Sequence, residues 1–335
     1  MAAGLTVAHR GQEPTMRVVM TGGGDFVGSH LLARMVGARM DVTLIGPDTG
    51  PSRYTASMVT AGDVRFVRCD ADFSDDVALR VTLENVDAIV LLGYVAPPRA
   101  SVAESFLDEL ARNVAPILRI LHAAEGAARH IVFASSVAVY GAPARVPVRE
   151  SDAARPLTPF GVAKLAAEQA VRVTCSAAGM TASILRYATV YGAGEAARQT
   201  IPDFISAALT DQHPVIDGDG LDEHDYIHVT DVAEGTLAAL RHRADGIYNV
   251  GTGIGTTTVD LARLVTRLAN TRAAPVCRTW SRPDHDRTRV VCDTVTAATH
   301  LAFTPRRALV DGITEEIGWL RAQLGRTPET PLAAA

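Results

Sequence analysis

Short apolar runs alternate with amphipathic stretches through the first two-thirds of this 335-residue chain, and this alternation limits the fold more than any other feature. Runs typical of buried strands occupy Val18–Met20, Val42–Ile45, Val64–Val67, Ala88–Leu92, Ile131–Ala134 and Ala182–Leu185. Helical patterns lie between them at Phe26–Ala38, Asp75–Leu83, Glu104–Ala124 and Gly161–Ala178. Such alternation implies right-handed crossovers and a parallel sheet covered on both faces. The sequence therefore predicts an α/β fold with a doubly wound parallel sheet.

The pattern loosens after about Arg186, where Gly, Pro and Asp accumulate. A strand and a helix return at Asp225–His228 and Asp231–Arg241, followed by an apolar run at Ile247–Val250 and a helix from about Thr257 to Asn270. We therefore expect a smaller second domain interleaved with late returns to the main sheet. The main domain is assigned residues 16–189 and 222–252, and the smaller one residues 190–221 and 253–325. Residues 1–15 are expected to form a flexible leader and residues 326–335 a frayed tail.

Composition excludes several classes of protein. With 47% hydrophobic residues the chain can bury a full core, and its net charge of −5 argues against a general binder of nucleic acid or anionic membranes. No 18-residue apolar run is present to cross a membrane, and the N-terminal segment does not resemble a signal peptide. The four cysteines form no CxxC pair, so we expect neither a disulfide framework nor a metal site, and a reducing cytoplasm fits.

The positive charges are distributed unusually between the two basic residue types. Of 32 Lys and Arg residues, one is a lysine, Lys164. A compact ammonium and a planar guanidinium are not interchangeable, so a lysine kept in an arginine-rich chain suggests a position that requires the ammonium. Chance survival of one surface lysine is the alternative at this point.

A glycine-rich turn joins the first expected strand to the first expected helix, in the sequence Thr21-Gly-Gly-Gly-Asp-Phe-Val-Gly-Ser29. Glycines at such a turn allow positive φ and let backbone N–H groups approach a phosphate at the helix N-terminus. The segment predicts a dinucleotide site that includes Gly22, Gly24, Asp25, Phe26, Val27 and Gly28. A tight turn that binds nothing is the alternative.

The turn resembles the TGGxGxxGSHL motif of the extended short-chain dehydrogenase/reductases of the NAD-dependent epimerase/dehydratase group, which have a Rossmann sheet. Asp25 occupies the position of the middle glycine. A carboxylate about 5 Å from a pyrophosphate charge would cost about 3 kcal/mol at an effective dielectric of 20. Either Gly24 allows the turn to direct Asp25 outward, or dinucleotide binding is weakened.

The resemblance also implies where the rest of the cofactor lies. Gly46 stands at the end of the second expected strand, where NAD-binding folds usually place an acid against the ribose, and Arg53 follows seven residues later. This favours NADP over NAD, with a solvated Arg53 as the alternative. Asp70 follows the third expected strand, where the family contacts the adenine.

Three further segments resemble the active site of that family. Phe133-Ala-Ser-Ser-Val-Ala-Val-Tyr-Gly141 is similar to SSxxVYG, which implies that Ser136 is the active-site hydroxyl. Asn113 matches an asparagine on the preceding long helix, and Lys164 falls on the lysine of the family's YxxxK motif. The resemblance implies that this lysine holds the nicotinamide ribose and lowers the pKa of the tyrosine.

The tyrosine of that motif is replaced by Phe160. Residues 160 and 164 share one helix face, but a phenyl ring cannot carry the proton that the family's tyrosine transfers. Either another group serves, with Ser136 through a water, Tyr94, His224 or the substrate itself as candidates, or catalysis is lost. Tyr94, at the end of the fourth expected strand, is either a relocated acid or a packing residue.

The second half of the chain follows the family's substrate-domain pattern, so the resemblance covers residues 16–321. In members that act on nucleotide sugars, two arginines grip the diphosphate. This chain has His224 at the first of these positions and Arg282 at the second, and Thr189 where the family often has asparagine. A protonated His224 can bind phosphate; an exposed turn histidine is the alternative.

These observations predict an NAD(P)-dependent epimerase or ketoreductase acting on a nucleotide-activated sugar or a related polyol or glycoside, with a non-standard acid/base. A non-catalytic nucleotide-binding regulator or assembly subunit, or a non-redox lyase or isomerase, are the alternatives. The resemblance also implies a homodimer formed through the helices at Glu104–Ala124 and Gly161–Ala178.

Overall fold

The computed structural model describes residues 15–24, 26–46, 50–52, 54–70, 73–93, 102–195, 199–278 and 288–324. Four of the candidate site residues, Asp25, Arg53, Tyr94 and Arg282, lie outside these residues. Most of the expected leader and all of the expected tail lie outside them as well.

A seven-stranded parallel sheet forms the larger layer of the molecule, in the order β10-β6-β5-β4-β1-β2-β3. Its strands are β1 (Arg17–Thr21), β2 (Asp41–Gly46), β3 (Val64–Arg68), β4 (Ala88–Leu91), β5 (His130–Ser136), β6 (Thr181–Tyr187) and β10 (Gly246–Val250). The predicted α/β class and doubly wound sheet are confirmed. The strand order reverses between β1 and β4, and in open α/β sheets ligands bind at the carboxyl ends of the strands beside such a point.

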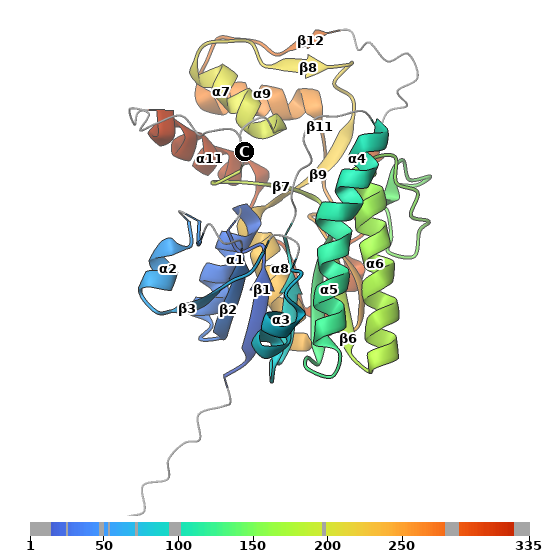
Figure 1. Cartoon of the computed structure of the whole chain (residues 1–335). Coiled ribbons are helices and arrows are strands. Elements are labelled where there is room, and N and C mark those ends of the chain that lie inside the picture. The colour runs from blue at the N-terminus through green and yellow to red at the C-terminus, as the bar shows by residue number, and fades with distance from the viewer. Residues whose placement is uncertain are drawn as a thin grey trace, which may run out of the picture.

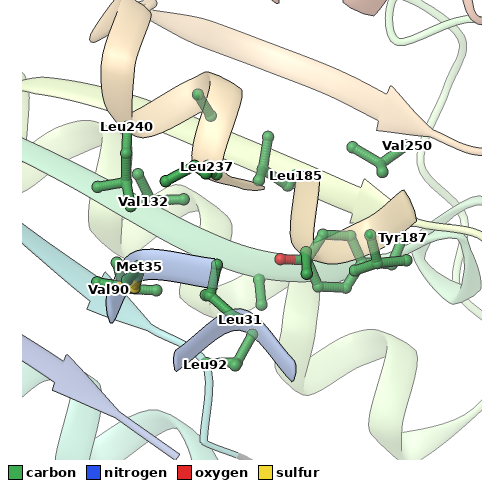
Figure 2. Close-up of a cluster of buried hydrophobic side chains, with 14 of the residues drawn as sticks. Leu31, Met35, Val90, Leu92, Val132, Leu185, Tyr187, Leu237, Leu240 and Val250 are labelled. Atoms are coloured by element: carbon green, nitrogen blue, oxygen red, sulfur yellow. The ribbon is translucent and has the colours of Figure 1, made fainter. Parts of the chain in front are cut away.

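Helices cover both faces of this sheet (Figure 1). Its helices are α1 (Phe26–Gly37), α2 (Ala56–Thr60), α3 (Asp76–Leu83), α4 (Val102–Glu109), α5 (Ala115–Ala124), α6 (Pro159–Ala178) and α8 (Val229–His242), with the 3-10 turn η2 at Val137–Tyr140. One core cluster packs α1 and α8 against one face (Figure 2). Another packs α3, α5 and α6 against the opposite face. Both faces of the strands are apolar for this reason, and the sequence shows continuous apolar runs rather than alternation.

The long helix expected at Glu104–Ala124 contains a break. The π-helical turn η1 (Leu110–Val114) separates α4 from α5. Pro116, in the first turn of α5, has no N–H to continue the helical ladder, which accounts for the widened turn before it. The turn carries Asn113 and lies against α6.

The second part of the molecule lies above the carboxyl ends of the large sheet (Figure 1). Its strands are β7 (Thr189–Tyr191), β8 (Val215–Asp217), β9 (Glu223–His228), β11 (Gly255–Thr257), β12 (Val276–Arg278) and β13 (Arg289–Val290). Its helices are α7 (Thr200–Leu209), α9 (Thr258–Ala269), α10 (Val295–Leu301) and α11 (Leu309–Leu324). The expected strand at Asp225–His228 pairs with β7, β11 and β13 and not with the large sheet, whereas α8 and β10 return to the large sheet. The domain boundaries themselves stay a prediction.

In the part of the chain that the structure describes, no helix is both long enough and apolar enough to cross a membrane. All four cysteines are free thiols.

Candidate active site

The glycine turn brings β1, β4 and α1 into close contact. Gly22 has φ +71°, and a Cβ there would lie 2.3 Å from the backbone nitrogen of Gly93. A Cβ on Gly28 would lie 2.1 Å from the carbonyl oxygen of Gly22, so the first turn of α1 rests directly on the end of β1. The backbone is thus open at the N-terminus of a helix, which is an arrangement that binds phosphate.

A cleft of about 420 Å³ opens on the β2 side of the turn. Its lining includes the three consecutive glycines, apolar side chains and a few polar ones: Gly22, Gly23, Gly24, Leu44, Ile45, Gly46, Phe66, Phe73, Ile117, Ile120, Thr21, Ser52, Asp70, Arg112 and Asn113. Flat apolar walls with a few polar groups are typical of a site for an aromatic base. The predicted positions of Gly22, Gly24 and Asp70 meet in this cleft.

Among the described residues at the end of β2, none carries an acidic side chain into the cleft. A Cβ on Gly46 would lie 2.8 Å from Cε2 of Phe66, so the phenyl ring fills the space beside this glycine. Asp70 accepts hydrogen bonds from the backbone nitrogen of Ser74 at 2.9 Å and from its hydroxyl. The carboxylate is therefore held in a fixed position at the wall of the cleft.

A second pocket, of about 290 Å³, lies on the other side of the glycine turn, and Gly22 lines both. It brings together predicted residues from three segments of the chain, Phe26, Val27, Gly28, Ser136, Phe160 and Lys164. Ser136 ends β5, and its hydroxyl accepts a hydrogen bond from the backbone nitrogen of Ala138 at 3.2 Å. The two cavities thus adjoin at Gly22, at the carboxyl ends of the strands.

Helix α6 presents Phe160 and Lys164 to this pocket from successive turns of one face. The helix begins with Pro159, and the hydroxyl of Thr158 accepts a hydrogen bond from the Gly161 nitrogen at 3.1 Å, which caps its first turn. A Cβ on Gly161 would lie 2.6 Å from the carbonyl oxygen of Ala138, so glycine allows α6 to approach the segment after β5.

The Lys164 amine is buried beside aromatic rings. Nζ donates a hydrogen bond to the carbonyl oxygen of Ala134 at 2.8 Å and lies 5.3 Å and 5.8 Å from the ring centres of Phe133 and Phe160. Burial lowers the pKa of Lys164 to about 8, although the carboxylates of Glu109 and Glu168 act in the opposite direction. The amine can therefore change its charge near neutral pH.

A buried polar network supports the ends of β5 and β6 behind the pocket. Glu168 accepts hydrogen bonds from Arg186 Nε and Nη2 at 3.0 Å and 2.7 Å and from the Ser135 hydroxyl at 2.5 Å. Glu109 accepts a hydrogen bond from Asn113 at 2.8 Å. The sequence analysis missed these acids; the four-residue spacing of Lys164 and Glu168 was the one available signal for Glu168.

The two other predicted substrate residues that the structure describes, Thr189 and His224, line neither cavity. Thr189 is exposed on β7, opposite Tyr226 in the register of β9. His224 lies on β9 beside Tyr226, with ring centres 6.1 Å apart, and neither cavity includes it. Burial lowers the pKa of His224, so the protonated form expected to bind phosphate is disfavoured.

A glycine turn at a helix N-terminus, an apolar base cleft and a buried lysine beside a strand-end serine define a dinucleotide-binding Rossmann enzyme site. The model of the NAD dependent epimerase/dehydratase family matches residues 18–251, and the chain belongs to this family. The resemblance seen in the sequence is thereby confirmed, and the family is one of NAD-dependent enzymes.

Relatives of known name match almost the whole chain. The UDP-glucose 4-epimerase of Azospirillum brasilense is 30% identical over 332 residues, covering 91% of this chain and 92% of that protein. A structure of the UDP-N-acetylglucosamine 4-epimerase from Methanobrevibacter ruminantium in complex with UDP-N-acetylmuramic acid has a TM-score of 0.83 at 25% identity, covering 92% of this chain and 99% of that one.

A second solved structure is a tyrosine-to-phenylalanine variant of the UDP-glucuronic acid 4-epimerase from Bacillus cereus, in complex with UDP-4-deoxy-4-fluoro-glucuronic acid and NAD. Its TM-score is 0.82 at 25% identity, and the match covers 92% of this chain and all of that one.

The described residues fit an NAD molecule. A Cβ at Gly22 or Gly28 would fill the space at the glycine turn. The 420 Å³ cleft has apolar walls, and the buried Lys164 amine lines the adjoining pocket. The apolar cleft suits the adenine end of a dinucleotide, and the pocket with Lys164 suits the nicotinamide end.

Proposed function

We propose that this chain is an NAD(P)-dependent epimerase or ketoreductase acting on a nucleotide-activated sugar, with an acid/base other than a phenol at position 160. The observation that carries the proposal is that the cleft at the glycine turn and the pocket lined by Ser136 and Lys164 adjoin at Gly22. A chain that had lost all chemistry would have no need to keep a buried amine and a strand-end hydroxyl at the end of a dinucleotide groove.

A bound dinucleotide would supply the acceptor, and on return the donor, for a hydride of the sugar carbon. The backbone at Gly22, Gly24 and Gly28 would bind the pyrophosphate, and Asp70 would lie beside the adenine end. The pocket residues would orient the other end, with Lys164 at the ribose and the Ser136 hydroxyl at the substrate oxygen. The Phe160 ring would exclude water from the reacting atoms.

The choice between NAD and NADP belongs to the same proposal. At the described end of β2 no acidic side chain is present to repel a 2′-phosphate. Gly46 occupies this position and packs against Phe66. Together with Arg53, this favours NADP, whereas the family relatives favour NAD.

The substrate class rests on the relatives and on the second part of the molecule. The relatives are named for UDP-sugars, and one Tyr-to-Phe variant holds both a nucleotide sugar and NAD. Thr189, His224 and Arg282 are the proposed substrate contacts, and Tyr94 stays a candidate acid. A cytoplasmic location, which four free thiols suit, is part of the proposal.

We also propose a homodimer formed through α4, α5 and α6. Large apolar side chains are exposed on these helices and the π turn between them: Leu107, Leu110, Leu118 and Val173. Exposed apolar surface of this kind is typical of subunit interfaces. Sedimentation at several concentrations tests this, and a monomer at all of them contradicts it.

Calorimetric titration of NAD and NADP into the protein tests the cofactor proposal, and NMR of a panel of UDP-sugars incubated with the complex tests the substrate class. We expect dissociation constants below millimolar and the appearance of an epimer or an oxidised sugar. No binding below millimolar would contradict every redox function.

The alternative favoured by Phe160 is a nucleotide-binding regulator without catalysis. The Phe160→Tyr variant separates the two. Activity in the variant alone would favour the regulator, whereas activity in the wild-type chain supports the enzyme.

A further inference from the structure

The pocket beside the glycine turn contains few groups that can exchange a proton. Among its described lining residues, two carry side chains that titrate, Lys164 and Tyr187. The hydroxyl of Tyr187 lies 2.7 Å from Thr236 Oγ1 on α8, and burial raises the pKa of this phenol well above its ordinary value. Tyr187 belongs to the core cluster with Leu237 (Figure 2), so its hydroxyl is committed to packing under α8. Lys164 is the group that faces the cavity.

The charged groups packed around Lys164 come from three elements. Glu168 follows it on α6, and its two oxygens already bind Arg186 of β6. Glu109 approaches from α4 on the other side, at the last residue before the π turn, and is 3% exposed. Arg112 in the π turn is exposed and lines the other cavity. Of the two carboxylates, that of Glu109 has the larger effect in raising the pKa of the Lys164 amine.

The π turn fixes the position of Glu109. Widened turns of this kind are frequent at functional sites because they redirect the side chains that flank them. Asn113 lies within the turn, four residues after Glu109 in the sequence. Its Nδ2 donates a hydrogen bond to the Glu109 carboxylate at 2.8 Å. Asn113 also lines the base cleft, so the same turn serves the cofactor groove and the acid beside Lys164.

We propose that the Lys164 amine exchanges the proton of the substrate hydroxyl directly, in place of the missing phenol, and that Glu109 is a positioning residue which holds the ammonium form. This inference rests on the proposed function. In the oxidation half, the neutral amine would take the hydroxyl proton while the hydride of the same carbon passes to the oxidised nicotinamide of the proposed function, giving a carbonyl and an ammonium. In the return half, the ammonium gives that proton back to the oxygen as the hydride returns to the opposite face of the carbon. The two halves sum to an epimerisation with no other reactant.

The environment of the amine suits both roles. A lysine at its ordinary pKa is neutral in about one molecule in 3,000 at pH 7. With the pKa of Lys164 lowered to about 8 by burial, about one molecule in ten is neutral at that pH. A base and an acid are then both populated in the working range.

The chain allows a direct measurement, because Lys164 is its one lysine. Incorporating lysine labelled with ¹³C at Cε gives a single side-chain resonance, whose chemical shift follows the charge of this amine in the wild-type protein. We expect a midpoint near pH 8 and a shift of about one unit downward in Glu109→Gln. Glu234→Gln, which removes an exposed carboxylate paired with Arg34, is the matched control and should leave the midpoint in place.

The second arm follows turnover of a UDP-sugar. Lys164→Arg keeps the positive charge and the donors but cannot lose a proton near neutrality, so we expect kcat to fall by about 10²–10⁴-fold while NAD still binds. In Glu109→Gln the rising limb of the kcat–pH profile should move to lower pH with the midpoint of the resonance. Thermal unfolding shows whether each variant is folded, and the pH shift in Glu109→Gln decides the matter if Lys164→Arg is not.

The outcomes separate the two claims. A Lys164 midpoint above pH 10, an unchanged midpoint in Glu109→Gln, or full turnover in folded Lys164→Arg would overturn the role of Lys164 and leave the enzyme standing. A wild-type protein that binds NAD but turns over no nucleotide sugar would overturn the proposed function and this role together.

Discussion

At Gly22 the backbone occupies a conformation that a side chain cannot share. Its φ is +71°, and the nearest backbone atoms of Gly93 leave no space for a Cβ. The motif that suggested a phosphate site is therefore also a packing requirement between β1 and β4. The sequence indicates the first role, and the structure adds the second.

Gly22→Ala should lower the free energy of unfolding by about 3 kcal/mol, since the methyl group must displace backbone atoms, and should weaken NAD binding at the same time. Gly37→Ala is the matched control, because a Cβ at that helix position meets no atom within 4 Å. Chemical denaturation and calorimetry measure the two effects. Equal stability of the two variants would contradict the close approach of the strands.

At the scale of elements, the end of β5 depends on charges buried between it, α6 and β6. The side chains of Glu168 and Arg186 are 0% and 4% exposed, and the guanidinium binds both carboxylate oxygens. A buried ion pair adds little to stability compared with an apolar pair of the same size. Removing one partner is destabilising, because the other charge is then buried and unpaired. Ser136 and Lys164 both stand next to this network.

Arg186→Met should therefore lower the free energy of unfolding by about 3–5 kcal/mol, because Glu168 would remain buried without its counter-ion. The exposed pair of Arg34 and Glu234 supplies the control, and Arg34→Met should change stability by less than about 1 kcal/mol. Urea denaturation compares them. If Arg186→Met lowers the free energy of unfolding no more than Arg34→Met does, the buried ion pair does not have the predicted effect on stability.

At the scale of the whole molecule, the second part adds buried acids that the family motifs do not anticipate. Burial raises the pKa of Glu316 to about 7 and that of Glu195 to about 9, and Glu316 lies near both Glu195 and Tyr191. The oxygens of Glu316 have no hydrogen-bond partner among the described residues. Over part of the pH range above 4.5, both carboxyl groups are therefore neutral in the folded protein but ionised in the unfolded chain.

This arrangement gives stability a specific pH dependence. A carboxyl group whose pKa is raised by folding contributes fully below its unfolded value of about 4.5 and loses that contribution as the pH rises through the folded value. Burial lowers the pKa of His130 to about 4. His130 therefore has the opposite effect on stability, which falls as the pH drops from 6.5 towards 4.

Glu316→Gln should remove about 3 kcal/mol of the loss in stability between pH 5 and pH 9, because the amide has no charge to bury. Denaturation at both values, with Glu234→Gln as the exposed control, measures the difference. A variant that loses stability with pH as steeply as the wild type would contradict the burial of an ionisable acid at this position.

Local patterns predicted a large part of this molecule and failed where distant segments meet. Apolar runs located the strands from Val18 to Leu185, since a strand buried on both faces must be apolar throughout. The break before Pro116 was missed because the helical periodicity continues through it. Glu109 was missed because its importance depends on Lys164, 55 residues later in the chain.

The site shows the same division. The meeting of Lys164, Ser136 and Gly28 at one pocket could be predicted from the sequence, because each stands in a local motif at a strand end or near the start of a helix. The exposure of Thr189 and the burial of His224 could not, because both depend on how β7 and β9 pair in the second sheet.

Spectroscopy of the NAD complex tests the central claim most directly. After calorimetry has established that NAD is bound, a saturating UDP-sugar is added in a single-turnover mixture, and the near-ultraviolet absorbance of reduced nicotinamide is followed. We expect this absorbance to rise in the wild-type protein and to rise at least a hundred-fold more slowly in Lys164→Arg. No rise with any UDP-sugar and no epimer or oxidised sugar in the mixture, in a protein shown to hold NAD, would contradict hydride transfer at this site.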